Sequence, residues 1–184
     1  MADIEWTLRW EADLSAGDHT ALAALCARYY PEDHATFVGA RSWYGARPEA
    51  RVIGYDGGRP VAHLGFIRRM LRLESGGSQL VGDVGLVGVD PDYQGSGLGR
   101  RLLAETTARL AGLGLPFGFL TCAPTVVGFY ATGGWRQSAG QVTRMIDADL
   151  RPETYAGPAL VLPVTASFGE WPAGETIIRD GLEV

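Results

Sequence analysis

The sequence contains little cysteine and no long apolar run, and each of these absences excludes a class of protein. Its 184 residues include two cysteines, Cys26 and Cys122, neither of them in a CxxC pair. That number is too small for the disulfide framework of a small secreted domain. No stretch approaches the roughly 20 apolar residues that a membrane-spanning helix needs, and the first residues lack the basic and apolar regions of a secretory signal. We therefore expect a cytoplasmic protein without a membrane partner.

Basic residues are also in the minority. Lys and Arg number 16 against 21 Asp and Glu, which gives a formal net charge of -5, whereas a protein that binds nucleic acid needs a basic face. The three histidines, His19, His34 and His63, share no metal-ligand spacing with one another or with the cysteines. We therefore expect neither a nucleic-acid partner nor a metal site.

The residues that are present are typical of one globular domain. A chain of this length buries a sizeable core, and its content of 46% hydrophobic and 20% charged residues is ordinary for a soluble protein. We find no internal repeat and no change of composition that would mark a linker. We therefore expect a single domain over residues 1–184, while the number of copies in an assembly, including a homodimer, stays open.

Hydrophobic periodicity predicts alternating strands and helices. Strands are predicted at 4–10, 51–55, 61–73, 80–89, 117–121 and 160–162, with a further pair within 135–146. Helices are predicted from a cap at Asp18 to Pro31, from 98 to 110 and from 125 to 130, and residues 31–50 form a long loop or a broken helix. Asp56-Gly57-Gly58 predicts a hairpin turn. This order favours an α+β fold, with a mixed, mainly antiparallel central sheet flanked by helices.

Three glycines, Gly82, Gly85 and Gly88, interrupt the predicted strand at 80–89. Glycine weakens a strand interior, so it indicates a place where a ligand or another backbone comes close.

The segment after this strand carries the strongest chemical signal, Gln94-Gly95-Ser96-Gly97-Leu98-Gly99-Arg100. Glycines at a strand-to-helix junction let backbone N–H groups turn toward a ligand, and the helix N-terminus adds partial positive charge. The segment therefore predicts a phosphate or pyrophosphate site, with a flexible turn as the alternative. It lacks the Gly-Lys-Ser/Thr of a P-loop and does not open a dinucleotide-binding series of parallel strands.

A second element raises the specificity of the first. Gly128-Phe129-Tyr130-Ala131-Thr132-Gly133-Gly134-Trp135 follows about 30 residues after the glycine loop, and the pair resembles the GNAT superfamily of N-acetyltransferases. The resemblance implies a GNAT-like fold, acetyl-CoA as the acyl donor, and a glycine loop on the CoA pyrophosphate. It also implies that the backbone of Val87 and Val89 pairs with the pantetheine arm, with the thioester held where the strands at 80–89 and 117–121 diverge.

Two branches of the superfamily are more similar still. The rhizobial nodulation N-acyltransferases, which acylate the amine of a chitin oligosaccharide, are similar over nearly the whole chain, including 6–11, 41–49, 53–56 and 171–174. The aminoglycoside 2'-N-acetyltransferases look similar from the glycine loop to Trp171-Pro172-Ala173-Gly174. Both act on sugar amines, so the resemblance implies an aminosugar acceptor. The glycine loop is complete here but degenerate in the nodulation enzymes, which favours a CoA donor over an acyl chain on a carrier protein.

Acyl transfer from a thioester needs an acid for the leaving thiolate and a route for the amine proton. Tyr130 is the predicted acid, because a phenol can donate to sulfur at neutral pH and its place in the motif matches the superfamily's usual acid; the alternative is a core tyrosine. Asp83 is the predicted base, directly or through water, since it alternates with Gly85 and Val87 along one strand face. It could equally end an exposed strand edge. Cys122, near where the thioester would lie, is interpreted as a small buried hydrophobe, with an acyl-Cys nucleophile as the alternative. Cys26 lies on the apolar stripe of its predicted helix and is interpreted as a core residue.

The acceptor is expected to contact aromatic and acidic side chains. Trp43, Tyr44 and Trp171 could stack on a sugar ring, with packing in the core or a lid as the alternative. Glu175 aligns with an acidic contact of the aminoglycoside enzymes, Glu170 lies near it, and both could simply be solvated.

Three hypotheses follow for the function. The first is acetyl transfer from acetyl-CoA to an aminosugar or aminoglycoside, as in antibiotic resistance. The second is a nodulation-like transfer of a longer acyl chain, and the third is a CoA-binding module without turnover. Tyr130 favours the two enzymes, because a module without turnover has no use for its hydroxyl.

Overall fold

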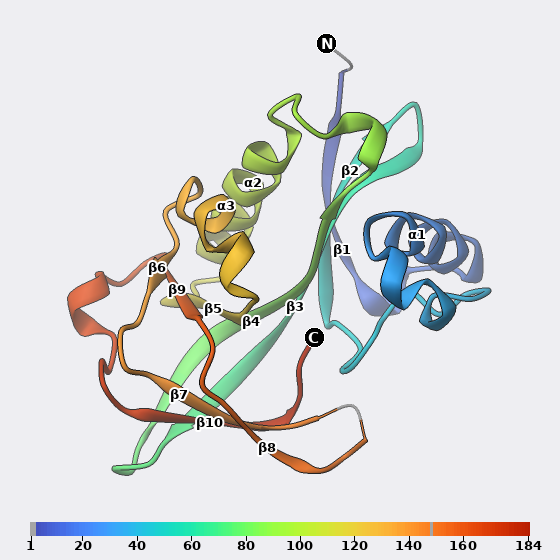
Figure 1. The fold of residues 1–184 in the computed structure, drawn as a ribbon. Helices are drawn as coiled ribbons and strands as arrows, with labels where there is room; N and C mark the ends of the chain where they lie inside the picture. Colours follow the sequence, from blue (N-terminus) through green and yellow to red (C-terminus); the bar gives the residue numbers. More distant parts are fainter. Residues whose placement is uncertain (1–2, 148) are drawn as a thin grey trace. The chain divides into compact units, whose positions relative to one another are not determined.

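The computed structural model describes residues 3–147 and 149–184 of the chain (Figure 1). Its contacts divide the chain into two compact units, which are described separately below. The first unit consists of the residues up to Ile67, Gly85–Thr106 and Val184. The second consists of Arg68–Val84 and Thr107–Glu183. The single domain that the length suggests stays a prediction.

The first unit combines antiparallel strands with two helices. Strand β1 (Glu5–Trp10) pairs antiparallel with β2 (Ala50–Asp56), which pairs antiparallel with the first half of β3 (Arg59–Leu73) across the predicted hairpin turn. Its other elements, in chain order, are η1 (Glu11–Asp13), α1 (Ala16–Tyr29), η2 (Pro31–Thr36), the end of β4 (Ser78–Val89), η3 (Pro91–Tyr93) and the start of α2 (Leu98–Gly112).

Helix α1 begins earlier than the sequence suggested. Ser15 is its N-cap, and Asp18, which we expected to be the cap, is the third helical residue and closes a capping box with Ser15. Leu22, Leu25 and Cys26 are buried on one face of the helix. Cys26 packs into a core cluster with Ala23, Phe37, Leu86 and Val184.

The second unit is built mainly from strands. The elements that complete it are β5 (Phe117–Thr121), η4 (Pro124–Val126), α3 (Val127–Ala131), β6 (Arg136–Gln137), β7 (Val142–Ile146), β8 (Pro152–Tyr155), β9 (Ala159–Pro163), η5 (Phe168–Glu170) and β10 (Thr176–Leu182). Strand β5 pairs parallel with β4 and antiparallel with β9, while β10 pairs antiparallel with β3 and parallel with β7. The mixed, mainly antiparallel sheet with flanking helices that the sequence predicted is confirmed.

Two strands of this unit, β8 and β10, were not predicted. Strand β10 carries Arg179 and Asp180 next to each other, which in isolation is the pattern of a solvated tail. Arg179 is nevertheless fully buried. This polar segment is therefore a strand that contributes a side chain to the core.

The glycines of β4 are explained by close approach. A Cβ atom at Gly85 would lie 2.2 Å from the Val184 carbonyl oxygen, and one at Gly88 would lie 2.3 Å from the Tyr29 ring. In the second unit, a Cβ at Gly82 would meet the Leu110 side chain at 2.7 Å. The space that these glycines leave is therefore filled by the protein's own atoms.

Candidate functional site

The glycine loop has the geometry that an anion-binding turn requires. Gly95 and Gly97 have φ values of +75° and +86°, and a Cβ at either position would meet nothing within 4 Å. All four residues from Gln94 to Gly97 are exposed, and α2 begins at Leu98. The first turn of a helix has N–H groups without helical partners, so this turn brings backbone donors to an open surface. Arg100 and Arg101 are exposed in that turn. These residues fit a pyrophosphate.

A buried carboxylate fixes the start of this loop. Asp90 is fully buried and accepts hydrogen bonds from Arg28, Arg59 and the Asp92 amide at 2.8–3.0 Å. Burial acts to raise the pKa of Asp90, but the Asp92 amide and the two guanidinium groups outweigh it and hold the pKa below its usual value. The lowered pKa favours the charged form of Asp90, which positions the loop, a role which the sequence did not reveal.

Strand β4 is distorted at Leu86, ahead of the two valines predicted to contact the donor. Leu86 has a φ of 53°, a left-handed conformation that is rare for a leucine. Its carbonyl oxygen lies 2.9 Å from His63 Nδ1 and accepts from the Tyr29 hydroxyl at 3.0 Å. Val87 and Val89 follow, both half-buried, and the Val87 carbonyl accepts from the Tyr30 hydroxyl at 3.4 Å. Backbone strain at a ligand site is common.

An inner chain of polar groups supports this distortion. Because His63 Nδ1 faces a carbonyl, it carries the proton, and His63 Nε2 is left to accept from Arg51 Nη1 at 3.1 Å. Arg51 is fully buried and also donates to Glu11 Oε2 at 2.6 Å. Burial and the Arg51 charge hold the pKa of His63 well below its usual value. His63 is thus a neutral core histidine.

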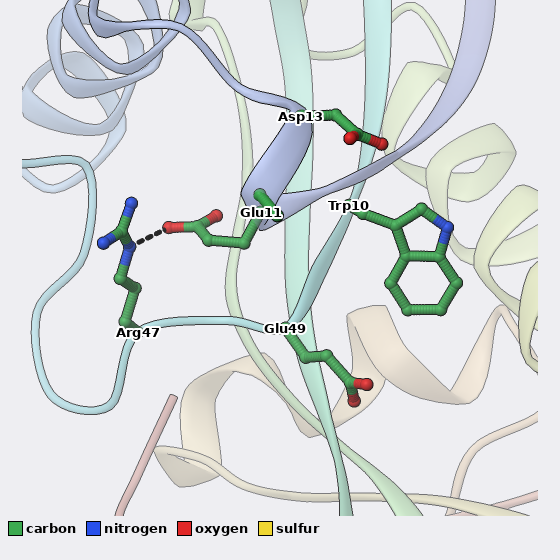
Figure 2. A pocket seen from close by; sticks show the side chains of 6 residues that line it. Trp10, Glu11, Asp13, Arg47 and Glu49 are labelled. Carbon is green, nitrogen blue, oxygen red and sulfur yellow. Dashed lines mark hydrogen bonds and ion pairs between the residues drawn. The ribbon is translucent and has the colours of Figure 1, made fainter.

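A surface pocket of about 640 Å³ lies at Glu11, the outermost residue of this polar network. It is lined by Trp10, Glu11, Ala12, Asp13, Arg47 and Glu49. Figure 2 shows Glu11 turned toward Arg47, to which it is hydrogen-bonded. Arg51 holds its other oxygen. Glu11 is therefore already neutralised by two guanidinium groups.

The two aromatic residues predicted on the 31–50 loop differ in exposure. Trp43 is half-buried, with the Arg47 guanidinium 5.0 Å from its ring centre and His19 against its edge. Tyr44 is 44% exposed. A solvent-facing ring can stack on a sugar, whereas Trp43 is largely committed to the protein.

In the second unit, Tyr130 lies on the short helix α3. Its side chain is 8% exposed and packs edge-on against Phe129 and Trp135, at 5.1 and 5.9 Å between ring centres. The Tyr130 carbonyl accepts from the Gly133 amide. The predicted motif therefore forms one compact turn around the tyrosine.

Asp83 is enclosed in the second unit rather than set at an exposed edge. It has no exposed surface, and its oxygens lie 3.0 Å from Arg179 Nη2 and 3.1 Å from Arg69 Nη1. Burial raises the pKa of Asp83, and the two guanidinium groups oppose that effect. A substrate amine would have to displace an arginine to reach this carboxylate.

The two tail residues are already engaged. Trp171 is 3% exposed, stacks on Phe119, meets Phe117 edge-on and donates its Nε1–H to Gln141. The core covers the Trp171 ring, which favours the packing alternative over stacking on a sugar. Glu175 is half-buried and accepts from the amide and hydroxyl of Ser75, so its first role is to tie down a turn.

Sequence reasoning missed a carboxylate in the second unit, Glu183. Thr121, the last residue of β5, donates its hydroxyl to Glu183 at 2.7 Å. Burial raises the pKa of the neighbouring Cys122 to about 11, which keeps that thiol protonated and supports its interpretation as a small hydrophobe.

In residues 3–147 and 149–184, no group of three or more His, Cys, Asp and Glu side chains could hold a metal ion. Among the helices in the same residues, none is long and apolar enough to cross a membrane.

The sequence is similar to one family of known proteins over its whole length. The family model described as "Nodulation protein A (NodA)" matches residues 1–184. Nodulation protein A of Bradyrhizobium elkanii is 37% identical over 197 aligned residues, which cover 98% of this chain and 92% of that protein. Nodulation protein A of Mesorhizobium plurifarium is 37% identical over 196 residues, covering 100% and 99%.

Solved structures give the fold. The GNAT family N-acetyltransferase YhbS of Escherichia coli, determined in complex with CoA, aligns with a TM-score of 0.65 over 97% of this chain and 92% of that one, at 16% identity. An acyl-CoA N-acyltransferase of Pseudomonas aeruginosa aligns with a TM-score of 0.60 over 87% and 99%, at 18% identity. The GNAT-like fold that the two motifs predicted is confirmed.

Proposed function

Because this chain belongs to the nodulation protein A family, and so is an N-acyltransferase with the GNAT fold, we propose that it transfers a long acyl chain from a phosphopantetheine thioester to the free amine of a chitin oligosaccharide. The observation that carries the proposal is the family match over residues 1–184. Among the three hypotheses drawn from the sequence, this match favours the nodulation-like transfer over acetylation of an antibiotic. The comparisons lend no support to an aminoglycoside acceptor or to a role in resistance.

The proposed donor site is the glycine loop. Backbone N–H groups at the start of α2 hold the phosphate, and Arg100 adds positive charge beside them. CoA carries a pyrophosphate, whereas the arm of a carrier protein carries a single phosphodiester. The open turn at Gly95 and Gly97 therefore favours acyl-CoA, and the carrier-bound thioester is the alternative donor with the same pantetheine chemistry.

The proposed chemistry is direct transfer. The thioester supplies an activated acyl group, the amine nitrogen bonds to its carbonyl carbon, and the carbon–sulfur bond breaks. Tyr130 donates its phenolic proton to the departing thiolate. Asp83 is poorly suited to direct contact with the amine, because both of its oxygens face buried guanidinium groups.

The test compares donors and acceptors in one assay with the full chain. The acceptor is a chitin tetrasaccharide with a free amine on its terminal sugar, and the control acceptor is the fully acetylated tetrasaccharide, which has no amine. Donors are acetyl-CoA, palmitoyl-CoA and palmitoyl carrier protein, and the readout is the mass of the N-acylated product together with thiol release.

We expect a palmitoyl product from the free-amine acceptor and no product from the control. Faster transfer from palmitoyl-CoA than from the palmitoyl carrier protein would support the glycine-loop argument, and the reverse order would identify the carrier as the donor. Acetyl transfer to an aminoglycoside, without palmitoyl transfer to the tetrasaccharide, would overturn the proposal.

A further inference from the structure

Glu183 sits at the end of β10 with its carboxylate fixed on one side and open on the other. Its Oε1 accepts the Thr121 hydroxyl at 2.7 Å and lies 3.8 Å from Arg179 Nη1. Arg179 also donates to the Thr121 hydroxyl oxygen at 3.3 Å. The Glu183 side chain is 40% exposed, whereas Arg179 is fully buried. A small molecule can therefore reach this carboxylate without breaking its anchoring contacts.

One arginine, Arg179, lies close to both Asp83 and Glu183. Arg179 directs Nη2 to Asp83 and Nη1 toward Thr121 and Glu183. The Asp83 side chain is fully buried, whereas the Glu183 side chain is partly exposed to solvent. The inner carboxylate can orient the arginine, and the outer one can exchange protons with a substrate.

Thr121 places this carboxylate at the carboxyl end of β5. Strand β5 runs parallel to β4, with Phe117–Phe119 paired to Val81–Asp83, and ends at Thr121. Ligands of parallel strands commonly bind beyond their carboxyl ends. The chain then continues from Thr121 through η4 into α3, which carries Tyr130. The segment that carries the proposed acid therefore starts at the strand end that holds Glu183.

We propose that Glu183 accepts the proton of the acceptor amine, an inference that rests on the proposed function. As the carbon–nitrogen bond forms and the carbon–sulfur bond breaks, the amine nitrogen loses one proton to the Glu183 carboxylate. The thiolate gains one proton from Tyr130. Exchange with solvent then returns a proton to the tyrosinate and removes one from Glu183, so the net reaction converts amine and thioester into amide and thiol. Arg179 and Asp83 are positioning residues.

The surroundings of Glu183 suit a base. Burial raises its pKa, Arg179 and the Thr121 hydroxyl oppose that effect, and the negative charges of Asp83 and Glu153 reinforce it, so the pKa lies above its usual value. Arg69, Cys122 and Tyr155 are the other ionisable groups that sense the Glu183 charge. A carboxylate with a raised pKa is a stronger base than an ordinary surface carboxylate.

The experiment compares Glu183→Gln, Glu183→Ala and a control on the same strand, Asp180→Asn. Asp180 is 54% exposed and pairs with Arg72 on the surface. We expect Glu183→Gln to lower kcat by about 10²–10⁴-fold while the rise in Tm on adding palmitoyl-CoA is unchanged. The acidic limb of the kcat–pH profile should disappear in Glu183→Gln, formate should restore part of the activity of Glu183→Ala, and Asp180→Asn should match the wild type.

The outcomes separate the two proposals. If the wild type transfers an acyl chain and Glu183→Gln keeps kcat within about threefold of it, Glu183 is not the proton acceptor. If kcat falls but formate restores nothing in Glu183→Ala, the residue has a structural role and the inference fails. A wild type that transfers no acyl chain at all would instead refute the proposed function.

Discussion

Asp83 Oδ1 and Arg179 Nη2 lie 3.0 Å apart with neither side chain exposed. The two residues are 96 positions apart in the chain and join β4 to β10. A buried ion pair adds little net stability, because both charges lose their hydration, but removing one partner leaves an uncompensated charge in the core.

Asp83→Asn should therefore destabilise the fold strongly. It leaves Arg179 and Arg69 without their counter-charge, and breaking a buried pair in this way costs about 3–5 kcal/mol. Denaturant unfolding of the variant measures the loss. Arg72→Gln, which breaks an exposed pair with Asp180, is the control and should cost about 0–1 kcal/mol. Equal small losses would mean that solvent reaches Asp83.

This pair also explains what the sequence could not reveal. Strand β5 was predicted with its observed bounds, because Phe117–Thr121 is a continuous buried run between turn residues. Strand β10 was missed, since Arg179 and Asp180 are adjacent and only the partner on β4 makes the arginine a core residue. Long-range pairing of charges leaves no periodic signal in one sequence.

In the candidate site too, local features could be predicted from the sequence, and features that depend on long-range contacts could not. Local motifs identified the glycine loop and the Tyr130 turn, because each is a contiguous segment with its own conformation. Asp83 was singled out by its strand alternation, which gave no indication of the two arginines that cover it. Glu183 carried no signal at all, because its interest comes from Thr121, 62 residues away.

The stability of the protein should fall as the pH falls below about 6.5. His63 is neutral in the fold, with a pKa well below the ordinary 6.5, so the unfolded chain binds a proton in this range and the folded chain does not. Stability is therefore fully present above pH 6.5 and is lost toward the lower folded pKa, at up to about 1.4 kcal/mol per pH unit for one histidine. His63→Gln should reduce this slope, measured as Tm between pH 5 and 7.5. His34→Gln, at an exposed position, should leave it unchanged, and an unchanged slope in His63→Gln would contradict the assignment.

Gly97→Glu should abolish the rise in Tm that an acyl-CoA produces. A ligand that binds only the folded state stabilises it by mass action, and the variant places a side chain and a negative charge in the loop proposed for the pyrophosphate. Gly140→Glu is a matched control, because Gly140 also has a positive φ, of 69°, and open space at its Cβ. Both variants carry similar backbone strain, so loss of the ligand-induced shift in both would show that strain and not the site is responsible.

Tyr130→Phe should lower kcat by about 10²–10⁴-fold, the usual contribution of a general acid, with little change in acyl-CoA affinity. The substitution keeps the ring that packs against Phe129 and Trp135, so the fold should be retained. Thiol release under conditions where chemistry limits the rate is the measurement. Tyr55→Phe, on β2, is the control. Equal turnover of wild type and Tyr130→Phe would remove the phenol from the mechanism and assign protonation of the thiolate to water.

Tyr44→Ala should raise the KM for the chitin tetrasaccharide by about two- to tenfold, in line with roughly 0.5–1.5 kcal/mol for one aromatic contact. The reason is exposure: Tyr44 is 44% exposed, whereas Trp43 packs against Arg47 and His19. Trp43→Ala should instead lower the Tm. Val38→Ser changes another exposed side chain of the same loop, 68% exposed, and should change neither quantity. If Tyr44→Ala keeps the wild-type KM, the acceptor does not stack on this ring. Glu175 is then the remaining predicted contact, and Glu175→Gln tests it in the same assay.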